Sequence, residues 1–102
     1  MTPQRLDPKT PNENLTFTFD FSQALVQGES ITNTYTIAVT TYIGVDASAS
    51  SMISGAASVN TGSGLILQNF AGGLPIIDYL LSCKVTTSLG RILEDQAILP
   101  VR

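Results

Sequence analysis

The sequence predicts an all-β protein: an antiparallel β-sandwich of six or seven short strands, preceded by an extended N-terminal arm. The chain has 102 residues, which gives room for a single domain with one two-layer core. From Leu15 onward, apolar side chains alternate with polar ones, and the residue types suit a pleated, half-buried surface. Turn-forming segments recur about every 8–12 residues, a spacing typical of β-sandwiches.

The proline-rich composition of residues 1–14 predicts the extended arm. They contain Pro3, Pro8 and Pro11, and Leu6 is their one internal large apolar side chain. Prolines push the preceding residue toward extended backbone, so we expect a polyproline-like segment that adds almost nothing to the core of the domain at residues 15–102. One interpretation is a frayed terminus. The other is a docking segment, in which these four side chains contact a partner and become ordered on binding.

The first half of the domain predicts two strands. Alternate positions in residues 15–21 place four apolar side chains on one face: Leu15, Phe17, Phe19 and Phe21. A short helical turn is expected at residues 22–28. Alternation resumes in residues 29–39, where the apolar face carries Ile31, Tyr35, Ile37 and Val39.

The middle of the chain carries a weaker pattern. Residues 41–64 are rich in Ser, Ala and Gly, and they predict either edge strands or a mobile loop. Small side chains bury little area, so we expect the least stable part of the domain here. Residues 65–70 then predict a strand between two turns.

The C-terminal third has the clearest alternation. Residues 78–87 place four side chains on one face: Tyr79, Leu81, Cys83 and Val85. Cys83 is therefore expected to be an inert buried thiol. A turn follows in which Gly90 is expected to need a positive φ. In the final strand, residues 92–101, Pro100 predicts a sheet edge, because proline cannot donate to a second neighbour.

The composition excludes several classes of function. There is no histidine, there is one cysteine, and the net charge is −3 with five basic residues. The default general base and the commonest metal ligand are therefore missing. The sparse basic residues argue against nucleic-acid binding, and no apolar stretch approaches the roughly 18 residues of a membrane span. We expect a soluble, non-enzymatic protein with no cofactor, no metal, no nucleic-acid partner, no membrane contact and no secretory leader.

The acidic residues do not form a convincing reactive group. Glu94 and Asp95 are adjacent in a predicted strand, so their side chains point to opposite faces and cannot converge on one atom. Together with Asp20, they are interpreted as solvated surface residues. Asp46 and Asp78 lack the spacing of a calcium loop. No catalytic residue is assigned.

Residues 79–90 carry the motif Y-x-L-x-C-x-V-x-T-x-x-G. It resembles the penultimate strand and following turn of fibronectin-type and related immunoglobulin-like domains. The resemblance implies an immunoglobulin-like sandwich with Tyr79 facing inward and its hydroxyl bonded to nearby backbone. Tyr79 and Gly90 are thus expected to be structural residues. The motif indicates a fold and no particular function.

Further segments resemble a small family of tailed-phage virion proteins, the fibre–tail adaptors. They are an Asp7-Pro8 dipeptide, FDFS at 19–22, GESIT at 28–32, AGG at 71–73 and KVTTSLGRILED at 84–95. The family usually has Trp where this chain has Phe21 and Tyr35, and a Trp-Leu-Ser-Gly-Gly element where this chain has residues 68–73.

This resemblance implies a virion protein that attaches a tail fibre or tail component to the particle. Its expected partners are other phage virion proteins, namely tail, fibre or head–tail components. The protein is expected to be present in multiple symmetric copies in the virion and to be synthesised in the cytoplasm of the bacterial host. A capsid decoration protein is an alternative. A carbohydrate-binding module is a third, ranked lower, for which Tyr42 and Phe70 are the available stacking platforms.

Overall fold

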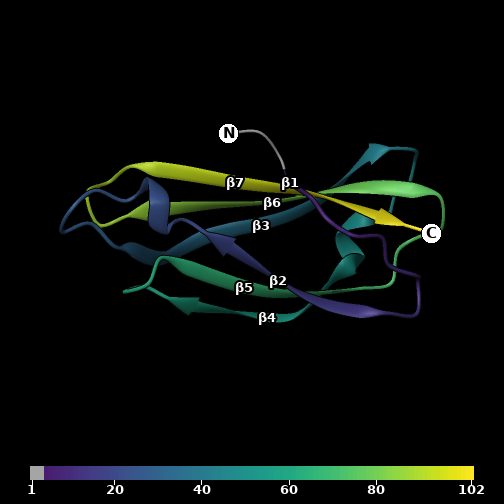
Figure 1. Cartoon of the computed structure of the whole chain (residues 1–102), viewed down its shortest axis with the longest axis horizontal. Coiled ribbons are helices and arrows are strands. Elements are labelled where there is room, and N and C mark those ends of the chain that lie inside the picture. Colours follow the sequence, from purple (N-terminus) through teal and green to yellow (C-terminus); the bar gives the residue numbers. More distant parts are fainter. Residues whose placement is uncertain (1–3) are drawn as a thin grey trace.

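Two β-sheets face each other across one core in residues 4–102, the part of the chain that the computed structural model describes (Figure 1). The four-stranded sheet has the order β1 (Gln4–Arg5), β7 (Ile92–Val101), β6 (Ile77–Thr87) and β3 (Ile31–Ile43). The three-stranded sheet has the order β2 (Asn14–Asp20), β5 (Leu65–Ala71) and β4 (Ile53–Asn60). Two short 3-10 turns complete the described elements, η1 (Ser22–Ala24) and η2 (Ala49–Met52). The predicted all-β sandwich is confirmed.

Paired strands are antiparallel except that β1 runs parallel to β7. The immunoglobulin-like topology stays a prediction. The observed orders are those expected if β2 to β7 correspond to strands B to G of that fold, with C-F-G in one sheet and B-E-D in the other.

The core forms where the alternating side chains of the two sheets meet. The inward positions that the sequence predicts on β6 are all buried. The fully buried side chains of the core include Phe19, Phe21, Phe70, Tyr79, Leu81 and Leu99. The Phe19 and Phe70 rings pack edge to face, with centroids 6.4 Å apart, a preferred arrangement of aromatic pairs. Phe21 is 1% exposed, so a phenylalanine fills this core position.

The Ser-, Ala- and Gly-rich middle forms an edge strand. β3 continues to Ile43, and β4 then borders the three-stranded sheet, where its register shifts between Ser54 and Ser58. Gln68 on β5 is buried at 3% exposure, and its Nε2 donates to the carbonyl oxygens of Ser54 and Gly55, each at 3.1 Å. One buried amide therefore satisfies two backbone carbonyl groups of the irregular stretch.

The position of the N-terminal arm differs from two expectations. Leu6 packs against the core, and its N–H donates to the carbonyl of Ile98 at 2.8 Å. The N–H of Lys9 donates to the carbonyl of Pro100 at 3.0 Å. The expectation that this segment adds almost nothing to the core is therefore wrong. The expectation that Pro100 marks β7 as a sheet edge is also wrong, because β1 pairs with β7 on that side. Proline is tolerated here because its carbonyl still accepts. The boundary at Leu15 remains a prediction about which part folds independently.

Candidate partner-binding surface

A charged cluster ties both ends of the described chain to β6. Asp78 is 4% exposed and accepts hydrogen bonds from Arg5 and Arg102, each at 2.9 Å. Burial alone would raise the pKa of Asp78, but the hydrogen bonds and charges of the two guanidinium groups outweigh it and hold that pKa below its usual value. The arm and the C-terminus therefore converge on one carboxylate.

At the same end of the sandwich, the buried side chain of Lys9 binds backbone carbonyl groups. It is 4% exposed, and its Nζ donates to the carbonyl oxygens of Thr10, Glu13 and Gly72 at 2.7, 2.8 and 2.6 Å. Burial lowers the pKa of Lys9, and the nearby Glu13 charge opposes that change. The ammonium group thus joins the arm to the β5–β6 loop, which begins at Gly72.

Tyr79 closes the β5–β6 loop from the core. Its ring is fully buried; its hydroxyl donates to Asp46 Oδ2 at 2.6 Å and accepts from the N–H of Leu74 at 2.8 Å. Burial and the Asp46 hydrogen bond raise the pKa of Tyr79. This is the geometry that the motif implied, with the backbone partner five residues upstream. Its structural role is a proposal, tested below.

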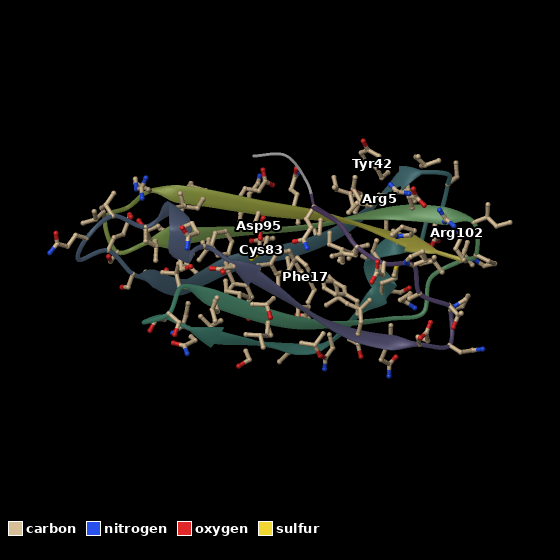
Figure 2. All side chains as sticks on the ribbon, in the orientation of Figure 1. Arg5, Phe17, Tyr42, Cys83, Asp95 and Arg102 are labelled. Carbon is tan, nitrogen blue, oxygen red and sulfur yellow. The ribbon has the colours of Figure 1, made fainter. Side chains whose placement is uncertain are left out.

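Large apolar side chains gather outside these contacts. Five of them make up what we call the apolar end: Tyr42, Ile43, Val45, Leu74 and Ile76. Their exposure runs from 48% at Leu74 to 86% at Val45. Ile43 lies opposite Asp78 in the β3–β6 register, and Figure 2 shows Tyr42, Arg5 and Arg102 toward the same end of the sandwich. Exposed apolar groups gathered at one place mark interaction surfaces more often than single ones do.

Ile76 has a strained backbone. Its φ is 65°, and it is the single non-glycine with positive φ among residues 4–102. A β-branched residue in this region is a genuine outlier. The N–H of Ile76 donates to the carbonyl of Val101 at 2.8 Å, while its side chain is 82% exposed. The loop therefore holds an isoleucine outward at a position that favours glycine.

The opposite end of the sandwich, which we call the glutamate end, is closed by an ion pair. The Glu29 carboxylate is buried and accepts from Arg91 Nε at 2.9 Å, from Arg91 Nη2, from Thr87 Oγ1 at 2.6 Å and from the N–H of Val26 at 3.0 Å. The Arg91 and Thr87 hydrogen bonds lower the pKa of Glu29 to about 2. Gly90 in the adjoining turn has a φ of 81°, as expected of a structural glycine, although its role too is a proposal.

The predicted partner-binding residues of the arm separate into two groups. Pro8 is exposed and precedes Lys9, which contacts the loop of the apolar end. Pro11 is half-buried, and Leu6 packs against the core. Pro3 lies outside the described residues. Pro8 and the apolar end are therefore brought to one side of the molecule, while Leu6 serves an internal contact.

The acidic residues differ partly from expectation. Asp20 is exposed and accepts from the N–H and Oγ of Ser22, which lowers its pKa. Asp95 is half-buried and lies opposite Cys83 in the β6–β7 register, near the middle of the sandwich in Figure 2. Burial raises the pKa of Asp95, as does the Asp20 charge. The interpretation of Asp95 as a fully solvated surface residue is wrong, because it shares the inward face with Leu93.

Cys83 is fully buried, and burial together with the Asp95 charge raises the pKa of its thiol to about 12. At neutral pH the sulfur is a protonated thiol and a weak nucleophile. Phe70 is also fully buried, so it cannot stack on a sugar, and the proposed carbohydrate platform loses one of its two aromatics.

Ligand-binding features are sparse in the described part of the chain. A shallow depression of about 190 Å³ lies on the outer face of the four-stranded sheet, lined by Thr34, Tyr35, Thr36, Lys84, Val85, Thr86 and Ile92. Among residues 4–102, no three His, Cys, Asp or Glu side chains are grouped so as to hold a metal ion. The same residues include no helix long and apolar enough to span a bilayer.

The fold and the apolar end together define a small β-sandwich with a surface suited to protein contacts. Residues 9–100 match the family described as Gp77, podophage GP4 fiber-tail adaptor protein gp77. The chain belongs to this family of phage fibre–tail adaptors, and it is a virion component by that membership. No curated protein matches the chain.

Two of the segments that suggested the family meet in the folded chain. GESIT supplies Glu29, and KVTTSLGR supplies Thr87 and Arg91, so two distant motifs form one ion-pair cluster. The pairing of these two motifs was not predicted from the sequence, nor were the burial of Lys9 and the contacts of Asp78. The opposite charges of Glu29 and Arg91, which stand in two of the quoted motifs, could have indicated that these residues pair. No feature of the neighbouring sequence indicated that Lys9 is buried.

Proposed function

We propose that this chain attaches a tail fibre or tail component to the phage particle without catalysing a reaction, through protein contacts made at the apolar end. The family membership over residues 9–100 supports an adaptor role. The proposal further holds that several symmetric copies act together and that Pro8 contributes to the contact.

One observation supports the choice of surface: five of the eight exposed large apolar side chains described lie at the apolar end. The polar groups behind them are already paired, since Tyr79, Asp78 and Lys9 all have partners within the chain. A partner that covers this end therefore gains apolar burial and breaks none of these contacts.

The experiment introduces charge at this surface. A Val45→Asp/Ile76→Asp variant is expected to fold with unchanged secondary structure and to be absent from purified particles. The matched control is Leu89→Asp/Ile92→Asp, which carries the same charges at the glutamate end, where both residues are exposed. Normal occupancy of the first variant, counted by quantitative mass spectrometry of particles, would contradict the proposed surface.

Particles lacking the protein test the role itself. We expect electron micrographs to show intact capsids and tails without fibres. Complete fibres on capsids with bare faces would instead favour the decoration alternative.

A further inference from the structure

The two edges of the four-stranded sheet are unequal. The β7 edge is covered by β1 and by the hydrogen bonds of Leu6 and Lys9, whereas β3, at the other edge, has a sheet neighbour only in β6 within residues 4–102. An edge strand presents unpaired backbone donors and acceptors to its surroundings. Natural edges are usually protected by lysine, proline, inward charges or short length. β3 has 13 residues and contains no charged residue and no proline.

Two inward-facing side chains of β3 stay partly open to solvent at this edge. Tyr35 and Ile37 point toward the core but are only half-buried, while their register partners Val85 and Cys83 on β6 are 1% and 0% exposed. Inward-facing side chains that stay partly open at an edge gain burial when another strand is added beside them.

In the regular part of β3, residues of similar type lie at equal distances on either side of Ala38. Its pairing with β6 is uninterrupted from Tyr35 to Thr41, with register shifts on both sides. Ala38 is the central residue of this stretch. If the same seven residues of a second copy ran antiparallel with Ala38 opposite Ala38, Thr36 would face Thr40 on the outer face, and Ile37 would face Val39 on the inner face. Threonine pairs and β-branched pairs are favourable cross-strand neighbours.

The other open edges suit such pairing less well. β4 contains a register shift between Ser54 and Ser58. β2 ends in the charged residue Asp20. A twofold pair requires that each strand be complementary to itself, and an uncharged strand brings no like charges together.

We propose that β3 pairs with β3 of a second copy of this chain, antiparallel about a twofold axis at Ala38, so that the two four-stranded sheets become one continuous sheet. The inference does not depend on the attachment role, because such a dimer forms from purified protein without other virion components. Failure of one proposal is therefore distinguishable from failure of the other.

The first test is sedimentation of the purified full chain across a concentration series. We expect a reversible shift from monomer to dimer. Ala38→Lys should abolish the dimer, because two ammonium groups would meet at the axis, while thermal unfolding confirms that the variant is folded. The matched control is Ser82→Lys, which adds the same charge on the same face of β6, directly beside Ala38 but one strand away from the axis. It should retain the dimer.

The second test fixes the register and does not depend on the behaviour of Ala38→Lys. Ala38→Cys should form an intermolecular disulfide on mild oxidation, since directly opposed residues of antiparallel strands lie within disulfide reach. Ser82→Cys should not. Cys83 is fully buried and does not compete. A monomer at every concentration, or a dimer in which Ala38→Cys fails to cross-link, overturns the proposal.

Discussion

The two ends of this sandwich are closed in different ways. At the glutamate end, a buried carboxylate is paired with Arg91 and Thr87. At the apolar end, Tyr79, Lys9 and Asp78 hold the arm and the loop in place from behind, while large apolar side chains point outward. The glutamate end thus contains a buried ion pair, and the apolar end has its internal hydrogen bonds beneath exposed apolar side chains. Under the proposed function, the glutamate end contributes mainly to folding, and the apolar end combines folding contacts with the surface for the partner.

The largest expected effect breaks the closure of the glutamate end. Arg91→Ala leaves the Glu29 carboxylate buried without its cation, a costly state for an ionised group. We expect the melting temperature at neutral pH to fall by many degrees, measured by circular dichroism. Arg91→Lys keeps the charge but loses the two-pronged hydrogen bonding, so its loss should be smaller. Equal stability of the wild type and Arg91→Ala would show that this ion pair does not stabilise the fold.

The Glu29 carboxylate at the same end should make the stability of the fold depend on pH in the acid range. The pKa of Glu29 is lowered from 4.5 to about 2 in the folded chain. An acid with a depressed folded pKa contributes stability that is fully present above its unfolded pKa and is lost as pH falls through the folded value. The stability difference between wild type and Glu29→Gln should therefore be constant near neutral pH and shrink between pH 4.5 and about 2. Urea unfolding across this range measures it, and a constant difference would contradict the assignment.

At the apolar end, Tyr79→Phe removes the hydroxyl that joins Asp46 to the N–H of Leu74. An unpaired buried group is costly, so unfolding free energy should fall by about 1 kcal/mol or more. Tyr42→Phe is the control, because that side chain is 53% exposed, and its stability should be unchanged. A Tyr79→Phe loss no larger than that of the control would remove the structural role proposed for Tyr79.

Two positions with positive φ sharpen the comparison, since the glutamate end has Gly90 and the apolar end has Ile76. The left-handed conformation costs a side-chain-bearing residue roughly 1–2 kcal/mol. Gly90→Val should therefore lower stability, whereas Ile76→Gly should leave it unchanged or raise it by up to about 1 kcal/mol, because glycine also gains freedom when unfolded. Chemical denaturation of both variants measures the effect. Destabilisation by Ile76→Gly would show that the side chain supports folding and is not held out for contact.

The smallest effect lies between the two ends, at Asp95. Burial and the Asp20 charge raise its pKa above the ordinary 3.8. An acid with a raised folded pKa destabilises the fold when ionised, and the penalty disappears as pH falls through the folded pKa. Asp95→Asn should thus raise the melting temperature slightly at neutral pH and have no effect well below pH 3.8. The neighbouring Glu94→Gln, on the opposite face of β7, is the control, and a gain of the same size there would contradict the explanation.

Much of the fold followed from the sequence alone. The two-residue period placed Phe19, Tyr79 and Leu81 in the core, because alternate side chains of a strand must share a face. The absence of histidine and the single cysteine argued against catalytic and zinc-binding interpretations, and the quoted motifs indicated the adaptor family. These are local properties, decided by residue type and by spacing along the chain.

The candidate surface was decided by tertiary structure. Arg5 and Arg102 lie far apart in the sequence but meet at Asp78, because β1 joins the sheet beside β7. The sequence of the arm predicts a polyproline-like segment, because proline restricts the local backbone. The burial of Leu6 and Lys9 depends on the edge of β7, which exists only in the assembled sheet. Glu29 and Arg91 became one cluster, and the exposed apolar residues of separate segments came to one end of the sandwich, for the same reason. Sequence determined which face of each strand is apolar, and only the packing of two sheets determined which of those apolar groups stay exposed.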